Sequence, residues 1–205
     1  MLRTDTLEKS TLDLLKHLQK MPLFDRLRLV GGTALALQLG HRRSVDLDFF
    51  GNINASGLQI ADELFENGYK DVEIRYDTKN IKIFNINQVK VDIVSYRYEW
   101  LESCIKTEGV SLAGLKDIAA MKLAAMTNRG TKKDFVDIYF LLQHFSLNQM
   151  LELYMQKYTD GTLFNVIRSI TYFADAEENS MPEMIVQVQW EDIKTTIRHA
   201  VERYQ

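Results

Sequence analysis

Cysteine is almost absent from this sequence: its 205 residues include one, Cys104. A single cysteine excludes an intrachain disulfide and a zinc site built from several cysteine ligands. The neighbouring Ser103 and Ile105 give no sign of an activated thiol nucleophile, so we expect a plain, partly buried thiol.

Long hydrophobic runs are also lacking. No stretch of about 18 consecutive apolar residues occurs, so we expect no membrane-spanning helix. Residues 1–5 lead into a polar, amphipathic pattern rather than into a signal peptide. We therefore expect a cytoplasmic protein that does not associate with a membrane.

The sequence has no strong excess of charge of either sign and no internal repeat. Its formal net charge of −3 argues against a protein that coats nucleic acid. With 46% hydrophobic and 26% charged residues, the chain can bury a full core as one domain or two small ones. Composition thus indicates an ordinary globular protein, and the function has to be read from motifs.

The most informative stretch runs from residue 29 to residue 50. It reads as a strand, a turn at residues 31–33 (Gly-Gly-Thr), a short apolar helix, a basic turn and a strand that carries Asp46 and Asp48. Because strand side chains alternate, the two carboxylates share one face. The residues between and beside them are expected to point into a core: Val45, Leu47 and Phe49.

This stretch combines two features of nucleotide chemistry. Two carboxylates a few Å apart need a neutralising cation, which favours a divalent-metal site. The glycine turn leads into a helix N-terminus, where free backbone N–H groups and the positive end of the helix dipole suit a phosphate. Metal-binding carboxylates beside a phosphate cradle indicate a protein that handles nucleotides.

Hydrophobic periodicity predicts an α+β fold with a mixed or antiparallel sheet, flanking helices and a helical C-terminal part. Strands are predicted at residues 27–30, 72–76, 81–86 and 89–95, with a hairpin at Asn87-Gln88. Helices are predicted at residues 6–20, 56–67, 112–127, 132–144, 147–157, 163–173 and 190–203, and a short extended segment at 181–190. We place a boundary near residue 110, between an α/β core over 1–110 and a helical domain over 111–205.

One further aspartate, Asp92, stands within an apolar strand between Val91 and Ile93. Burying an ion costs several kcal/mol unless the ion is paired or bound to a metal. Two interpretations stay open: a surface aspartate on a half-exposed strand, or a third carboxylate of the site. In the second case Asp92 could also take the proton of an attacking hydroxyl.

Three residues of the helical part carry charge at informative positions. Lys122 lies in line with the apolar stripe of its helix, so it either snorkels to the rim or reaches into a pocket. Residues 131–134 have the form of a capping box, which explains Asp134 structurally. Asp137, further along the same helix, has no such explanation.

Together these features resemble the AbiEii/AbiGii group of nucleotidyltransferase-like toxins, which have the polymerase-β-type nucleotidyltransferase fold. The resemblance covers about residues 28–145. The matching motifs are Gly31-Gly32-Thr33-Ala34-Leu35 with Gly40-His41-Arg42, Ser44-x-Asp46-Leu47-Asp48-Phe49-Phe50, Val91-Asp92-Ile93, and Lys122-(x)6-Arg129-Gly130-x-Lys132-Lys133-Asp134-Phe135-Val136-Asp137-Ile138-Tyr139-x-Leu141. The last motif is the more specific, because an Asp-x-Asp pair also occurs in unrelated metal enzymes.

The resemblance implies a role for each matching position. Nucleotide-binding residues would be Gly31, Gly32, Thr33, Ser44, Lys122 and Arg129, with Gly32 and Thr33 facing the triphosphate. Ligands of Mg²⁺ (or Mn²⁺) would be Asp46, Asp48 and Asp92, and Asp137 would join them as a catalytic residue from the helical side. Gly-Gly replaces the Gly-Ser of other nucleotidyltransferases, so Thr33 would supply any hydroxyl to the phosphate.

The resemblance also implies a function. Such a protein would transfer a nucleoside monophosphate from a nucleoside triphosphate (NTP) to an acceptor such as RNA or tRNA. It would act as the toxin of a toxin–antitoxin, abortive-infection type system with a cognate antitoxin protein. An RNA acceptor could be guided electrostatically by His41, Arg42, Arg43, Arg129, Lys132 and Lys133. For Arg43, Lys132 and Lys133, solvated turn residues are an equal interpretation.

Two other functions are compatible with the motifs. The fold can be kept without catalysis, as a nucleotide-binding or protein-interaction module. A phosphatase that uses Asp46 as covalent nucleophile is disfavoured, because bulky Phe49 and Phe50 follow the carboxylates where such sites present smaller residues.

Overall fold

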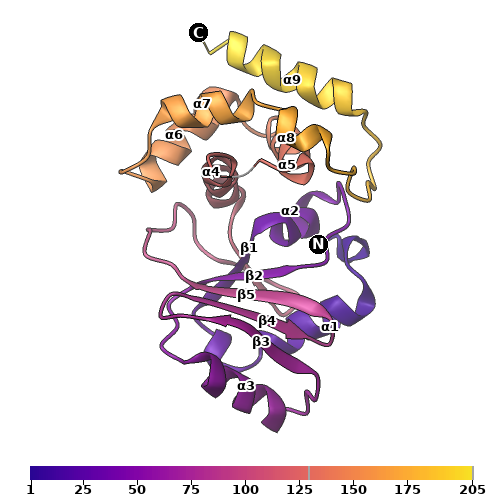
Figure 1. Ribbon diagram of the computed structural model, residues 1–205, viewed down its shortest axis with the longest axis vertical. Coiled ribbons are helices and arrows are strands. Elements are labelled where there is room, and N and C mark those ends of the chain that lie inside the picture. The colour runs from indigo at the N-terminus through magenta and orange to yellow at the C-terminus, as the bar shows by residue number, and fades with distance from the viewer. Residues whose placement is uncertain (129, 205) are drawn as a thin grey trace.

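A mixed β-sheet lies at the centre of the computed structural model, which describes residues 1–128 and 130–204 (Figure 1). Over these residues the strand order is β3-β4-β5-β2-β1-β7-β6. The strands are β1 (Leu27–Val30), β2 (Leu47–Gly51), β3 (Val72–Asp77), β4 (Ile81–Ile86), β5 (Val89–Ser95), β6 (Ile105–Thr107) and β7 (Val110–Leu112). The pairs β2/β5 and β1/β7 are parallel, and the other neighbours are antiparallel.

The helices divide between the two halves of the chain. The first half contains α1 (Lys9–Leu18), α2 (Gly31–Leu39) and α3 (Gly57–Glu66), with short 3-10 turns at Thr4–Thr6 and Pro22–Phe24. The second half contains α4 (Leu115–Met126), α5 (Lys132–Leu141), α6 (Leu147–Lys157), α7 (Leu163–Ile170), α8 (Ala174–Glu177) and α9 (Trp190–Glu202). None of the helices within residues 1–128 and 130–204 combines the length and the apolar character that crossing a bilayer requires.

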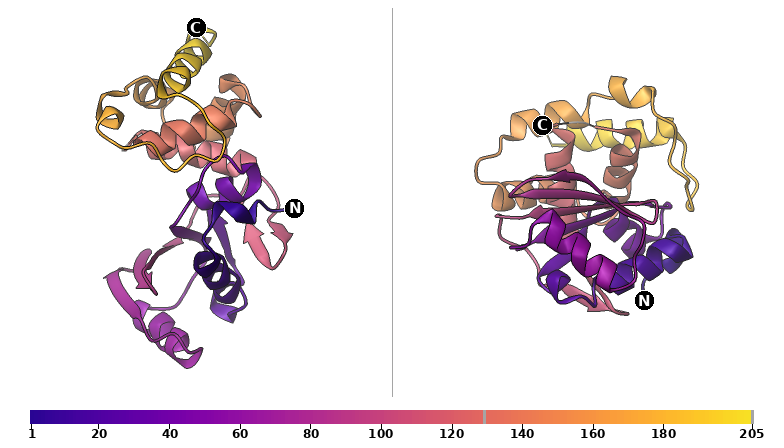
Figure 2. Two further views of the ribbon diagram at one scale, coloured as in Figure 1. Left: turned by 90° about the vertical axis from the view of Figure 1, so that its right-hand side faces the viewer. Right: turned by 60° about the horizontal axis from the view of Figure 1, so that its bottom comes forward.

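The later helices gather at one end of the molecule, beyond the sheet (Figures 1 and 2). Helix α2 lies between the two parts, because it contacts β1 and β2 on one side and α4 and α5 on the other. Helix α3 packs at the opposite end, against β3. The segment that runs from β1 through α2 to β2 is therefore where the sheet meets the helical part.

The α+β fold with a mixed sheet is confirmed, and so is the hairpin between β4 and β5. Its two turn residues, Asn87 and Gln88, have φ angles of 48° and 67°, as the tight two-residue turn that joins antiparallel strands requires. Strands β6 and β7 were not predicted, because three residues are too few to show alternation. The sheet ends at Leu112, and the division into two domains near residue 110 stays a prediction.

Alternation along β2 and β5 fixes which side chains reach the core. Leu47 and Phe49 on β2 are fully buried, as expected, and so are Val91 and Ile93 on β5. Val45 was expected to be buried and is 62% exposed. The physical reason is that β2 begins only at Leu47, so the alternation does not extend back to Val45.

Candidate active site

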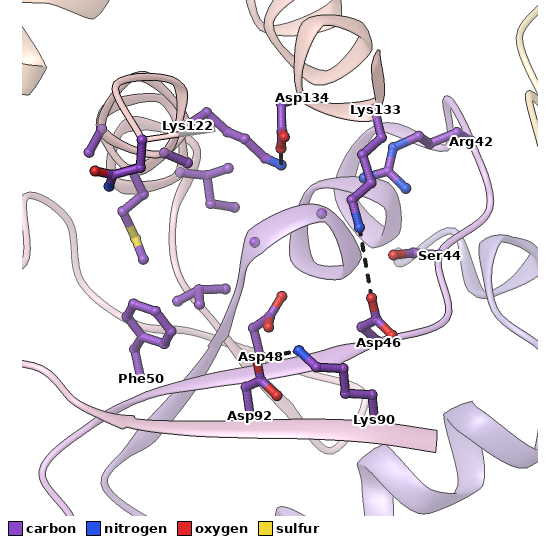
Figure 3. Close-up of a pocket in the computed structure, with 18 of the residues that line it drawn as sticks. Arg42, Ser44, Asp46, Asp48, Phe50, Lys90, Asp92, Lys122, Lys133 and Asp134 are labelled. Atoms are coloured by element: carbon purple, nitrogen blue, oxygen red, sulfur yellow. Dashed lines mark hydrogen bonds and ion pairs between the residues drawn. The ribbon is translucent and has the colours of Figure 1, made fainter. Parts of the chain in front are cut away.

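Three aspartates lie together on the two central strands. Asp48 on β2 pairs in register with Asp92 on the parallel strand β5. Asp46 comes immediately before β2. All three line a cavity of about 540 Å³ between the sheet and the helical part (Figure 3).

The carboxylates are more crowded than their ion pairs can neutralise. Burial, with the negative charge of Asp92 alongside, raises the pKa of Asp48 to about 6. Asp92 Oδ2 lies 2.5 Å from Lys90 Nζ, and Asp46 Oδ2 lies 3.8 Å from Lys133 Nζ. Asp92 Oδ1 is buried and has no hydrogen-bond partner among the described residues. This end of the cavity would therefore accommodate a further cation.

Two glycines bring the start of α2 against these carboxylates. Gly31 has a φ of +68°, and a Cβ there would lie 2.5 Å from Asp48 Oδ2. A Cβ on Gly32 would collide with the Arg42 guanidinium. The expected turn at these residues is absent, since α2 begins at Gly31 directly after β1. Val30, the cap residue, offers no side-chain hydrogen bond, so the helix start faces the cavity without a cap.

Thr33 lies behind the cavity rather than in it. Its side chain is buried, and Oγ1 donates a hydrogen bond to the backbone carbonyl of Asp46 and lies 2.8 Å from Ser44 Oγ. The hydroxyl expected to face a triphosphate instead fixes the segment before β2. Ser44, which does line the cavity, is the hydroxyl on the open side.

Lys122 reaches into the cavity from α4. Its side chain is buried rather than snorkelled to the rim, which resolves the two alternatives. The Nζ atom lies 2.9 Å from Asp134 Oδ1 and 2.6 Å from Asp137 Oδ2. Burial alone would lower the pKa of Lys122, but the negative charges of Asp137 and Asp134 raise it above its usual value. The lysine is thus a fixed positive charge on the helical side of the cavity.

Asp137 was expected in the site, but it lies one layer behind the cavity and is fully buried. Its carboxylate accepts hydrogen bonds from Arg42 Nε at 2.7 Å and Arg42 Nη2 at 2.9 Å. His41 Nε2 lies 2.8 Å from the same carboxylate. Burial would raise the pKa of Asp137, but Lys122 and Arg42 hold it well below its usual value. Asp137 therefore reaches the cavity only through the two cations that it holds.

Two of the basic residues expected to guide RNA are part of this buried cluster. His41 and Arg42 are almost fully buried, although the Arg42 guanidinium borders the cavity. Lys132 is also buried, with its Nζ 3.3 Å from the carbonyl of Glu177. The sequence predicted a basic turn that could guide RNA, but the buried Asp137 draws the side chains of His41 and Arg42 inward, and burial lowers the pKa of His41.

The remaining basic residues differ in their access to the cavity. Arg43 pairs with Glu183 at 2.8 Å on the surface. Lys133 has a half-exposed side chain, lines the cavity and points at Asp46 (Figure 3). Arg129, expected to contact nucleotide phosphates, lies outside the described residues.

Several lining residues were not predicted: Phe50, Lys90, Met121, Asn128 and Tyr158. Alternation could have found two of them, because Lys90 shares a strand face with Asp92 and Phe50 shares one with Asp48. Nothing in the sequence marks Tyr158, which reaches the cavity only because α6 packs against α4.

The oxygen atoms of this site fit a magnesium ion that takes some of its ligands from the protein and the others from a substrate. Among the described residues, no three histidine, cysteine, aspartate or glutamate side chains converge into a ready-made metal cage. Mg²⁺ is usually held by one or two carboxylates together with phosphate oxygens and water. Asp46 and Asp48 offer two such carboxylates, and the unpartnered Oδ1 of Asp92 offers a third oxygen.

Comparison with known proteins shows the family of this chain. The family described as "Nucleotidyl transferase AbiEii toxin, Type IV TA system" matches residues 13–203. The chain belongs to this family. The resemblance found in the sequence is thereby confirmed, and so is the nucleotidyltransferase class that it implied.

Individual relatives of this AbiEii family member cover nearly its whole length. Uncharacterized protein aq_aa25 of Aquifex aeolicus (strain VF5) is 31% identical over 97% of both chains. The crystal structure of JHP933 from Helicobacter pylori superposes with a TM-score of 0.64 at 20% identity, over 96% of this chain and 92% of that one. MenT4, the nucleotidyltransferase toxin Rv2826c from Mycobacterium tuberculosis H37Rv, superposes with a TM-score of 0.57 at 16% identity, over 95% and 86%. At these identities the two structures show a shared fold.

Proposed function

We propose that this chain transfers a nucleoside monophosphate from an NTP to an acceptor, with Mg²⁺ or Mn²⁺ as cofactor. The acceptor class that we propose is RNA, such as tRNA, and the biological role is that of a toxin restrained by a cognate antitoxin. One observation carries the proposal. Three carboxylates, an uncapped helix start and a buried lysine from the helical part face a single cleft.

Asp46 and Asp48 would hold the metal ion, together with phosphate oxygens of the nucleotide. When bound, such an ion neutralises the phosphate charge and stabilises the charge that develops during in-line displacement. Burial and the negative charge of Asp92 raise the pKa of Asp48, and this supports the assignment because a bound cation would favour the ionised carboxylate.

Positive groups around the cleft would orient the triphosphate. The first backbone N–H groups of α2, at Gly31 and Gly32, suit a phosphate because glycine has no side chain of its own to block the approach. Lys122 and Arg42 present fixed cations, and Ser44 offers a hydroxyl on the same side. Electrostatic preorganisation of this kind is usually a large part of phosphoryl-transfer catalysis.

Asp92 would receive the acceptor. Asp92 lines the cleft, and its Oδ1 atom has no hydrogen-bond partner among the described residues, so the carboxylate has capacity to accept a hydrogen bond from an attacking hydroxyl and then its proton. Asp137 acts one layer further out, as a positioning residue that holds Lys122 and Arg42. Loss of Asp137 should therefore impair nucleotide binding through these cations.

A labelling experiment tests the proposed function. Purified protein is incubated with Mg²⁺, total RNA and each of the four α-labelled NTPs in turn. We expect label in an RNA species with at least one NTP, and no label with Asp48→Ala. No transfer with any NTP and a broad acceptor pool would contradict the proposal. NTP binding that persists in Asp92→Asn, without turnover in the wild type, would favour a non-catalytic nucleotide-binding module.

A further inference from the structure

One end of the cleft is apolar and has no role in the function proposed above. It is lined by Phe50 from β2, by Ile118, Met121 and Ala125 from α4, and by Tyr158 at the end of α6. Phe50 and Met121 are half-buried, so part of each side chain is open to the cavity. A mixed sheet–helix surface of this kind suits a flat apolar group.

The apolar end lies opposite the end that attracts phosphate. Figure 3 shows Phe50 on one side of Asp48 and Asp92, with Asp46, Lys133 and Ser44 on the other side. Phe50 shares a strand face with Asp48, because it is two residues further along β2. The cavity thus passes from cations, across the carboxylates, to an apolar wall.

From this order we infer that the apolar end binds the nucleobase of the incoming NTP. The inference rests on the proposed function, which places the α-phosphate at the carboxylates. If the β- and γ-phosphates extend from there toward Arg42, Ser44 and Lys133, then the ribose and base extend the other way, toward Phe50. The base stacks on the Phe50 ring and contacts the Met121 thioether.

The wall is held in place by an aromatic cluster outside the cavity. The rings of Phe50 and Tyr96 pack with their centroids 5.2 Å apart. Tyr96 Oη lies 2.9 Å from Tyr158 Oη, and Tyr158 packs edge-on against Tyr98 at 4.7 Å. Because Phe50 comes from the sheet and Tyr158 from the helical part, a bound base would contact both parts of the molecule.

Asn128 provides a polar group that can read the base edge. It lies in the turn after α4, two residues beyond the last helical residue Met126, and lines the same cavity. An amide presents both a donor and an acceptor, as a base edge does. Asn128 is therefore placed at the cavity wall where an amide can contact the base edge.

The test compares two ligands that both have three phosphates, of which only one, the NTP, also has a ribose and a base. Dissociation constants for each NTP and for inorganic tripolyphosphate are measured by calorimetry with Mg²⁺ and no acceptor. We expect the wild type to bind at least one NTP more tightly than tripolyphosphate. Phe50→Ala should raise the dissociation constant of that NTP about tenfold, since stacking of a base on an aromatic ring contributes about that factor to affinity. Tripolyphosphate affinity should stay within about twofold.

Three further variants guard against indirect effects. If Phe50→Ala does not fold, Phe50→Leu replaces it, because leucine keeps an apolar side chain. Phe50→Leu should also weaken the binding of NTP and leave the binding of tripolyphosphate unchanged. Phe50→Trp should restore NTP affinity, because it keeps an aromatic face. Phe164→Ala is the matched control, because Phe164 on α7 is 73% exposed and does not line the cleft. We expect it to bind both ligands as the wild type does.

Each contrary result has a distinct meaning. If Phe50→Ala weakens tripolyphosphate as much as NTP, the wall has no specific contact with a base and the inference is wrong. If NTP affinity is unchanged and the KM of the acceptor rises instead, the wall binds the acceptor and the inference is also wrong. If the wild type binds neither ligand, the proposed function itself fails, and the inference fails with it.

Discussion

At the scale of single residues, Asp137 organises the positive side of the cleft. It is fully buried and balances Arg42 and Lys122 at 2.7 Å and 2.6 Å. Asp137→Asn keeps the shape and removes the charge, which leaves two buried cations without their main partner. Breaking a buried ion pair costs about 3 to 5 kcal/mol, and we expect a loss of this size in the free energy of unfolding by urea.

A matched control for this variant is Asp160→Asn. Asp160 pairs with Arg97 at 3.2 Å, but both side chains are more than half exposed. Exposed pairs contribute about 0 to 1 kcal/mol, so the unfolding free energy should change little. A loss as large as that of Asp137→Asn would mean that burial of the Asp137 cluster has no special importance.

The same cluster predicts how stability depends on pH. Lys122 and Arg42 hold the pKa of Asp137 below the value of the unfolded chain, against the effect of burial. Its contribution is therefore complete above the unfolded pKa, about 4, and is lost as the pH falls through the folded value. We expect the difference in unfolding free energy between wild type and Asp137→Asn to shrink below about pH 4. A difference that is constant from pH 7 to pH 2 would contradict this account.

Alanine substitutions at two glycines with similar backbone conformations can distinguish the effect of backbone strain from the effect of a side chain entering the site. Gly31 and Gly109 have φ angles of +68° and +78°. A Cβ at Gly31 meets the Asp48 carboxylate, whereas a Cβ at Gly109 has no described atom within 4 Å. Alanine at either position should cost about 1 to 2 kcal/mol of backbone strain. Nucleotide transfer by the folded protein should fall strongly in Gly31→Ala and stay near wild type in Gly109→Ala.

At the scale of elements, a C-terminal segment supports the loop that carries Arg42. The N–H of Arg43 donates to the carbonyl of Glu183 at 2.8 Å, and the N–H of Ile185 donates to the carbonyl of His41 at 3.0 Å. Ile185→Pro removes one of these donors and leaves the His41 carbonyl with the N–H of Val186, at 3.0 Å, as its remaining donor from this segment. We expect the variant to fold and to transfer nucleotide several-fold more slowly, because Arg42 is less firmly placed. Gln187→Pro, two residues further along the exposed segment, should transfer at the wild-type rate.

Helices and strands whose hydrophobic pattern repeats over many residues were predictable from the sequence. Elements of only three residues were not. The β4–β5 hairpin and the helices α5 and α6 follow from alternation or helical spacing. Strands β6 and β7 have three residues each, and β7 joins the sheet through its pairing with β1. Such pairing depends on contacts between residues distant in sequence, which a local pattern does not contain.

The same limit applies to the site. Asp46, Asp48 and Lys122 were predicted as site residues, and all three line the cleft. Asp137 was predicted beside them because the family resemblance implies a catalytic role for it, while the sequence itself showed only that it has no capping role. Its partners Arg42 and His41 are 95 and 96 positions away in the sequence, so a local pattern could not show that it is already paired.

At the scale of the whole molecule, the charge of the cleft predicts that transfer depends on a metal ion. Three aspartates face the cavity, and a triphosphate would add further negative charge. We expect excess chelator to abolish transfer, and Mg²⁺ or Mn²⁺ to restore it. Circular dichroism spectra should be the same with and without chelator, since the proposed ion would lie in the open cleft and not inside the hydrophobic core. Full transfer in excess chelator would contradict the assignment of Asp46 and Asp48.

The central claim is that the sheet and the helical part supply one catalytic cleft together. Its most direct test is the rate of labelled-nucleotide transfer by Asp48→Ala and by Lys122→Gln, one variant from each part, with Phe164→Ala as control. We expect each cleft variant to be at least about 100-fold slower than wild type, because removal of one preorganised charge costs about that much. The control should keep the wild-type rate. A folded Lys122→Gln protein that transfers nucleotide at the wild-type rate would contradict the claim.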